Sequence, residues 1–232
     1  MISLDERLAA VASLVRPGSR VADVGTDHGY LIARLLLEKK AVFGYACDIH
    51  QKPLDKARET LKSCGLESLS RCLLGDGLSG LLPEQIDDIV IAGMGAETIL
   101  HILDEAGWQD SGQRFLLQPM SKHHLLRAGL YRRGYEILQE KAVIVKGFAY
   151  TVLGARWCGR IRTVDSFFAR TGLLPQSWSA AAQIYLEKQA QSLENAAKGL
   201  AQSNTNGNYE LEYYEMTRKI REILEQWKRE KG

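Results

Sequence analysis

Apolar residues in the first part of the chain alternate between short runs and longer segments with helical spacing. The short runs, typical of buried strands, occupy 20–24, 41–48, 70–74, 88–92 and 114–118. Helical segments follow them, near 29–39, 53–64, 97–106 and 121–133. This alternation predicts an α/β fold with a doubly wound, mostly parallel sheet.

Both ends of this α/β pattern carry further elements. Two apolar runs, 135–144 and 150–158, lie close together and predict an antiparallel hairpin that closes the sheet. Ahead of the first strand, Ser3 and Glu6 form a capping-box pattern that apolar residues follow at helical spacing. We therefore expect a leading helix, and we expect the domain to end near Arg160.

The chain beyond residue 160 has a different pattern. Apolar residues there follow four-three spacing in two stretches, which contain Leu186, Ala190, Leu193, Ala197 and Leu200, then Tyr213, Met216, Ile220, Ile223 and Trp227. A polar loop, 204–208, separates the two stretches. The pattern predicts an antiparallel helical hairpin with coiled-coil packing. Two domains result, a core domain over 1–160 and a helical hairpin over 161–232.

Composition limits the class of protein. The 232 residues carry a formal net charge of +2, contain no long apolar run and show no signal-peptide pattern at their start. The four cysteines have no metal-ligand spacing, and the adjacent His123 and His124 would point in different directions on a helix. We expect a cytoplasmic enzyme with reduced thiols, no metal and no membrane association, either a monomer or a weak homodimer.

The sequence directly after the first strand, Asp23-Val-Gly-Thr-Asp-His-Gly29, has the features of a cofactor turn. Unpaired N–H groups at the start of the next helix attract a carboxylate, and Gly25 and Gly29 let the backbone approach closely. Asp23 could accept a charge-assisted hydrogen bond from an ammonium group. S-adenosylmethionine carries both of these groups.

Acids or glycines also end the next three strands. Asp48 suits the ribose hydroxyls, and Asp76 suits the adenine amino group. Arg7 on the leading helix could reach the cofactor carboxylate or RNA, although an ordinary exposed arginine on an amphipathic helix is the default interpretation. The residues expected to hold S-adenosylmethionine are Arg7, Asp23, Gly25, Thr26, Gly29, Asp48, Ile49, Gly75, Asp76, Gly77, Ala92, Gly93, Met94 and Gly95.

NAD is the rival cofactor. Its fingerprint is G-x-G-x-x-G, whereas the turn here is Gly25-x-x-x-Gly29, and Asp27 would repel a pyrophosphate. Ordinary turns of a flavodoxin-like fold would explain the glycines, but not an acid at three successive strand ends. S-adenosylmethionine is therefore favoured.

Basic residues are concentrated between Lys122 and Arg162, where only Glu136 and Glu140 oppose them. Such a stretch could neutralise phosphates, or it could be an ordinary solvated surface. The residues expected to bind RNA are Lys122, Arg127, Arg132, Arg133, Arg156 and Arg160.

Together these motifs resemble the bacterial tRNA (adenine-N1)-methyltransferases that act on adenine 22. The resemblance is carried by Asp23–Leu31, Asp48 with Pro53-Leu54, Gly75–Leu78, Ile91–Gly95 and Gln118-Pro119. It implies a Rossmann-like enzyme that uses S-adenosylmethionine to methylate N1 of an adenine in the D-arm region of tRNA. The chain departs from the family pattern at Ala96, usually glycine, and at Met120, commonly asparagine.

Four polar residues are candidates for aligning the base, since a ring nitrogen needs alignment more than deprotonation. Asp27 could stabilise positive charge on the adenine or accept its amino proton, or it could cap a helix. His28 could contact substrate or accept a proton, or simply pack. Gln118 lies at a strand end, and Tyr150 could stack on a flipped base or belong to the core.

Two other functions remain open from the sequence. One is an S-adenosylmethionine-dependent methyltransferase of a small molecule or protein, and the other is a noncatalytic S-adenosylmethionine-binding RNA partner. The basic stretch and the helical hairpin favour a large anionic substrate, and the Asp27-His28 pair favours catalysis.

Overall fold

The computed structural model describes residues 2–109, 112–203 and 207–231. Seven strands form one sheet in the order β3-β2-β1-β4-β5-β7-β6. The strands are β1 (Ser19–Val24), β2 (Ala41–Asp48), β3 (Ser70–Leu74), β4 (Asp88–Met94), β5 (Arg114–Pro119), β6 (Tyr135–Val145) and β7 (Phe148–Trp157). The first five are parallel, and β7 pairs antiparallel with β5 and β6. The predicted sheet and its closing hairpin are confirmed.

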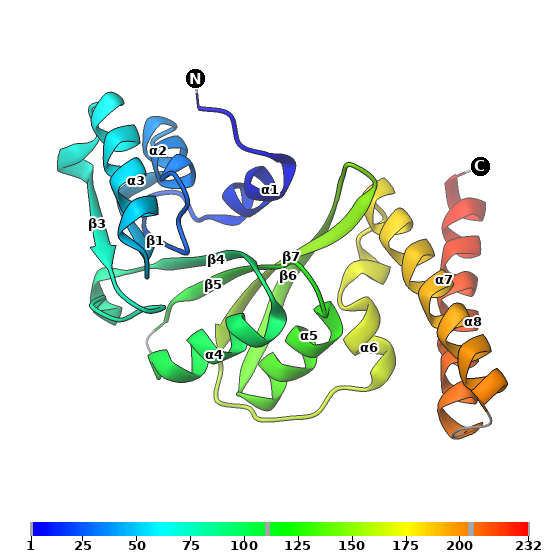
Figure 1. Cartoon of the computed structure of the whole chain (residues 1–232). Helices are drawn as coiled ribbons and strands as arrows, with labels where there is room; N and C mark the ends of the chain where they lie inside the picture. The colour runs from blue at the N-terminus through cyan, green and yellow to red at the C-terminus, as the bar shows by residue number, and fades with distance from the viewer. Residues whose placement is uncertain (1, 110–111, 204–206, 232) are drawn as a thin grey trace.

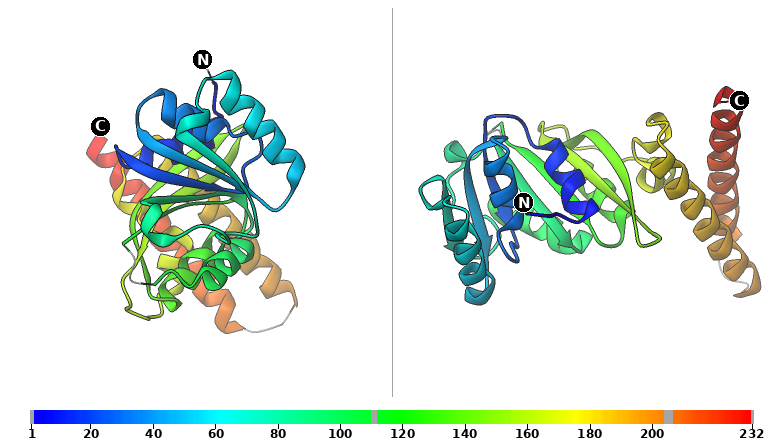
Figure 2. Two further views of the ribbon diagram at one scale, coloured as in Figure 1. Left: turned by 90° about the vertical axis from the view of Figure 1, so that its left-hand side faces the viewer. Right: turned by 90° about the horizontal axis from the view of Figure 1, so that it is seen from above.

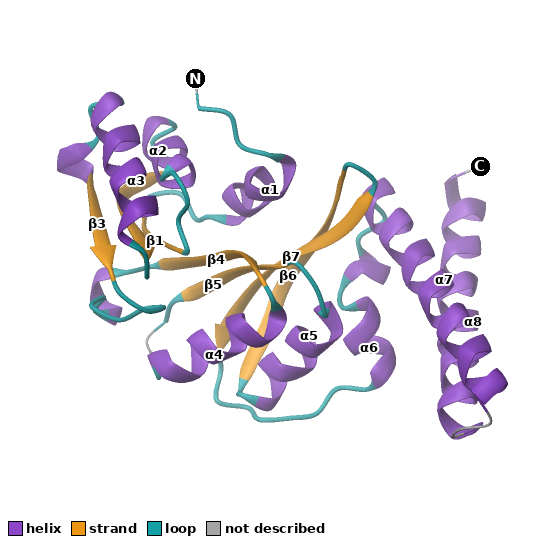
Figure 3. Ribbon diagram, viewed as in Figure 1, coloured by secondary structure: helices purple, strands orange, loops and turns teal. Residues whose placement is uncertain are grey.

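Helices cover both faces of the sheet (Figure 3). The helices on one face are α1 (Glu6–Leu14), α2 (Tyr30–Leu37) and α3 (Gln51–Ser63), and those on the other are α4 (Ala96–Ala106), α5 (His123–Arg132) and α6 (Ser166–Thr171) (Figure 1). Short 3₁₀ turns occupy Glu67–Leu69, Pro83–Gln85 and Leu174–Gln176. Successive residues of β4 feed the two cores, since Val90 packs under the first helices and Ile89 and Ile91 under the second.

The start of α1 differs from the prediction. Asp5 is the N-cap, and its carboxylate accepts a hydrogen bond from the N–H of Leu8 at 2.8 Å. The expected capping box of Ser3 and Glu6 is therefore wrong, because aspartate caps a helix strongly and Asp5 lies two residues nearer its first turn.

Two long C-terminal helices, α7 (Ala180–Ser203) and α8 (Gly207–Lys231), run alongside each other as predicted (Figure 2). Their contact face buries Leu186, Leu193, Met216 and Ile220. The loop expected at 204–208 falls partly on residues 204–206, outside the described residues, and the domain boundary near residue 160 stays a prediction. No described helix is both long and apolar enough to cross a membrane.

A buried ion pair connects α7 to the sheet. Arg127 on α5 lies 2.6 Å from Glu140 on β6, and both side chains are fully buried. Arg127 also donates to the carbonyl oxygen of Ala169 at 2.8 Å and to the hydroxyl of Tyr185 on α7 at 3.2 Å. The second Glu140 oxygen accepts from the N–H of Leu173. The expectation that Arg127 binds RNA is therefore wrong, because its guanidinium is fully buried and cannot contact a phosphate.

We predict that Arg127→Met lowers the free energy of unfolding by about 3–5 kcal/mol, because it leaves Glu140 buried and uncompensated. Urea denaturation of the whole protein measures this change. The matched control is Arg218→Met, which removes an exposed pair with Glu222 and should cost far less. Equal losses in the two variants would contradict the prediction.

Candidate functional site

The carboxyl ends of the parallel strands enclose a cleft of about 330 Å³. Nine of the residues expected to hold the cofactor line it, and these are Gly25, Asp48, Ile49, Gly75, Asp76, Gly77, Ala92, Gly93 and Met94. Four separate strand ends thus contribute to one cavity, at the position where open α/β sheets bind ligands. The cleft is large enough for a small-molecule cofactor.

Gly25 lines this cleft and packs closely against Met94. Its φ of 78° lies in the left-handed region, and a Cβ built there would lie 2.2 Å from the terminal methyl of Met94. Both observations favour glycine at this position. The Met94 methyl thus occupies the space that a side chain at residue 25 would need, and the backbone of the turn after β1 forms part of the cleft wall.

Asp23 is a buried acid without a counterion. It is 7% exposed and has no ion-pair partner among the described residues. Burial raises the pKa of Asp23 to about 6; the Thr26 hydroxyl opposes the rise and the Asp48 carboxylate adds to it. A cationic ligand group would satisfy this carboxylate.

The other residues of the cofactor turn shape it without lining the cleft. Thr26 is buried, and its N–H donates to the carbonyl of Cys47 on β2 at 2.9 Å. Gly29 caps α2 with a φ of 67°, where a Cβ would lie 3.0 Å from that of Ala57 on α3. Gly95 is the N-cap of α4.

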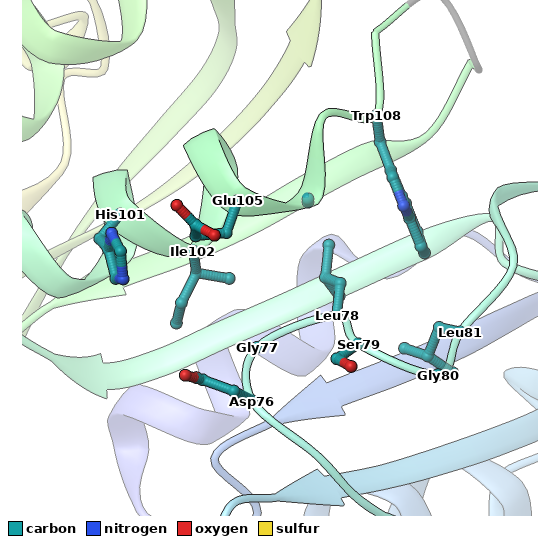
Figure 4. Close-up of a pocket in the computed structure, with 11 residues that line it drawn as sticks. Asp76, Gly77, Leu78, Ser79, Gly80, Leu81, His101, Ile102, Glu105 and Trp108 are labelled. Carbon is teal, nitrogen blue, oxygen red and sulfur yellow. The ribbon is translucent and has the colours of Figure 1, made fainter.

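Helix α4 supplies cleft residues that the sequence analysis missed, namely Thr98, His101 and Ile102. A second hollow of about 490 Å³ adjoins the cleft and shares Asp76, Gly77, His101 and Ile102 with it. Figure 4 shows His101 and Ile102 projecting from α4 above the loop that carries Asp76. The helical spacing of these residues directly after Gly95 was the available signal. Val24 and His50, which also line the cleft, adjoin residues that were identified.

Gln118 is fully buried, and its side-chain amide bonds to backbone groups. Its Oε1 accepts from the N–H of Gly93 at 3.1 Å, and its Nε2 donates to the carbonyl of Pro119 at 2.8 Å. The expectation that Gln118 acts on the substrate is wrong for this reason. Its position at a strand end is correct, but the side chain holds the end of β4 in place.

Arg7 connects Gln118 with Tyr150. One of its nitrogens lies 3.4 Å from the Gln118 oxygen, and the other pairs with Asp5 at 2.7 Å. Its guanidinium also lies 5.6 Å from the ring centroid of Tyr150, a cation–π arrangement. Arg7 is not among the residues that line the cofactor cleft. The structure therefore brings it together with two expected substrate-side residues.

Asp27 and His28 lie in the turn after β1 but do not line the cleft. His28 Nε2 lies 3.3 Å from an Asp27 oxygen, and the His28 ring stacks on Tyr30 at a centroid distance of 5.0 Å. The N-cap of α2 is Gly29, which leaves no capping role for Asp27. Asp27 is instead an exposed carboxylate.

The remaining basic residues fall on two edges of the sheet. Lys122 precedes α5 at the cleft edge, where it pairs with Glu97 at 2.6 Å. The other four residues lie at the opposite edge, where β6 begins and β7 ends. They are Arg132, Arg133, Arg156 and Arg160. There Arg133 pairs with Asp104 of α4. Arg156 and Arg160 both pair with Glu136. Their binding of RNA stays a prediction.

Histidines and cysteines show no metal arrangement. His123 lies 3.2 Å from the Tyr185 hydroxyl, and burial lowers the pKa of His123 to about 4. All four cysteines are free. Within the described ranges, no group of three histidine, cysteine or acidic residues could hold a metal ion.

Comparison with known proteins identifies similar sequences and folds. A family model described as a methyltransferase domain matches residues 4–153. The chain is 32% identical over 197 residues to the tRNA (adenine(22)-N(1))-methyltransferase of Bacillus subtilis, a match that covers 84% of this chain and 83% of that protein.

Two crystal structures extend this similarity to nearly the whole chain. The B. subtilis M1A22 tRNA methyltransferase TrmK has a TM-score of 0.79 at 27% identity, covering 98% of this chain and 99% of that one. A putative tRNA (m1A22) methyltransferase of Streptococcus pneumoniae, in complex with S-adenosyl-L-methionine, has a TM-score of 0.80 at 28% identity, covering 97% and 100%.

We predict that affinity for S-adenosylmethionine falls as the pH drops below about 6. Below its pKa of about 6, Asp23 is protonated in the free protein and cannot pair with the α-ammonium of the ligand. The loss should approach roughly tenfold per pH unit, and affinity should level off above the pKa. Calorimetric titration across this range measures the effect.

The control for this titration is a pair of asparagine variants. Asp23→Asn should bind more weakly and lose the pH dependence, whereas Asp55→Asn, an exposed acid on α3, should keep both. A pH dependence that persists in Asp23→Asn would show that another group is responsible.

Proposed function

This chain belongs to the family of bacterial tRNA (adenine(22)-N(1))-methyltransferases, and we propose that it transfers a methyl group from S-adenosylmethionine to N1 of adenine 22 in tRNA. The single observation that carries the proposal is the convergence of four strand ends on one cleft beside an unpaired, buried Asp23. That cleft fits a cofactor with a cationic amino-acid end.

The geometry of the cleft supports the cofactor-binding roles that we propose. Asp23 would hold the α-ammonium, and the backbone of the turn at Gly25, which lines the cleft, would receive the carboxylate. One oxygen of Asp48 accepts a hydrogen bond from the N–H of His50 at 2.8 Å, and the other would bind the ribose hydroxyls. Asp76, exposed between the two hollows, would bind the adenine amino group.

When bound, S-adenosylmethionine supplies an electrophilic methyl group, which the in-plane lone pair of adenine N1 can accept without a general base. The protein then has to align the base, and Tyr150 is the residue that we assign to stack on it. Arg7 fixes the Tyr150 ring through its cation–π contact. The Asp27–His28 pair is our candidate for stabilising the positive charge or accepting the amino proton.

The partner of the protein is tRNA, and we place the reaction in the cytoplasm. The free state of all four cysteines accords with a reducing compartment. We infer a monomer or a weak homodimer. Methylation of a small molecule or protein, or noncatalytic binding of RNA, would replace the proposal only if tRNA is not methylated.

We predict that the protein transfers labelled methyl groups from S-adenosylmethionine to unmodified tRNA transcripts, giving N1-methyladenosine at position 22. Nucleoside mass spectrometry and mapping of the modified position measure this product. A transcript with guanine at position 22 is the substrate control and should remain unmethylated. Cofactor binding without any methylation of tRNA would contradict the proposed activity.

A matched pair of glycine variants tests the cofactor turn in the same assay. Gly25→Ala should lower kcat/KM by at least roughly tenfold, because the added Cβ lies against Met94 and φ is positive. Gly199→Ala, on α7, adds a Cβ that meets no neighbour within 4 Å and should leave the rate unchanged. Equal rates in the two variants would remove our assignment of the turn.

A further inference from the structure

The β6–β7 hairpin extends past the edge of the sheet where the cofactor cleft opens. The ladder between β5 and β7 runs only from Phe115↔Ala155 to Leu117↔Leu153. The ladder between β6 and β7 continues to Val145↔Phe148. The hairpin tip therefore lies beyond the last residues of β5, with α1 on one side and the start of α7 on the other (Figures 1 and 2).

The two faces of this hairpin differ in what covers them. Ala142 and Ala149 lie on the face that packs against α7 and its neighbours. Tyr150 and Phe148 lie on the opposite face, since strand residues alternate. Arg7 from α1 covers Tyr150, but Phe148 is 67% exposed. The exposed ring of Phe148 thus lies on the same face as Tyr150, two residues nearer the hairpin tip.

The turn at the tip places a cation beside this ring. Lys146 and Gly147 have φ values of 48° and 80°, and positive φ at both central residues is typical of a tight hairpin turn that continues the strand twist. Lys146 is exposed and has no ion-pair partner among the described residues. The turn thus presents a flat apolar ring and a positive charge two residues apart, the combination that binds a nucleobase and its phosphate.

We propose that Phe148 stacks on a nucleobase of the tRNA next to the target adenine, with Lys146 on the adjoining phosphate. This contact would hold the neighbouring base while the target adenine leaves its stack for Tyr150, so the hairpin tip lowers the cost of unstacking. The proposal deepens the proposed function and rests on it. It assigns substrate binding to a segment that lies outside the cofactor cleft.

The test combines single-turnover methylation with the fluorescence of tRNA that carries 2-aminopurine at position 22. Phe148→Ala should abolish the fluorescence change on binding and slow methyl transfer by roughly 5- to 160-fold, the range expected from loss of one base–aromatic stack. Phe148→Trp should restore both readouts. Because Phe148 is largely exposed, these variants should fold normally.

The matched control is Val42→Ala, which truncates a strand residue that is 53% exposed near the start of β2, at the amino ends of the parallel strands. It should behave as the unaltered protein, and affinity for S-adenosylmethionine should be the same in every variant. Wild-type fluorescence and rate in Phe148→Ala, or full recovery in Phe148→Leu, would overturn the stacking contact while leaving the activity established. Failure of the unaltered protein to methylate tRNA would instead refute the proposed function on which this contact depends.

Discussion

A bulge near the end of β4 determines how the candidate site is built. The register with β5 shifts between Ala92 and Met94, and Gly93 between them has a φ of 78°. A bulge redirects the residues that follow it, and here Met94 reaches the open space at Gly25. The freed N–H of Gly93 is satisfied by the buried amide of Gln118. The cofactor turn and the end of β5 are thus held against the same short piece of chain.

Two buried charge arrangements in this protein have opposite consequences. Arg127 and Glu140 neutralise each other's charge, so neither needs a charge from a ligand. Asp23 has no such partner, and raising its pKa from 3.8 to about 6 means that ionisation costs the folded state about 3 kcal/mol above pH 6. A cationic ligand removes this cost when it binds. The free energy that the unpaired carboxylate takes from the stability of the free protein therefore contributes to the affinity for the ligand.

Local patterns allowed the sheet and most of the cofactor cleft to be predicted, because glycines and acids at strand ends are local in sequence and converge in any parallel sheet. The roles of Arg127 and Gln118 could not be predicted in this way. Whether a polar side chain is exposed or buried depends on contacts such as Arg127 with Tyr185, 58 positions away. For the same reason the spacing at Ser3 and Glu6 did not reveal that Asp5 caps the helix.

Helix α5 joins the candidate site to the C-terminal helices. It begins at His123, just after the Gln118–Pro119 segment, and His123 lies 3.2 Å from the hydroxyl of Tyr185 on α7. One turn later Arg127 bonds to the same hydroxyl. The connecting segment 159–163 is exposed and makes a long path between the two parts. Buried side chains therefore set the position of α7 relative to the cleft edge, and a tRNA that touched both parts would meet a surface of fixed geometry.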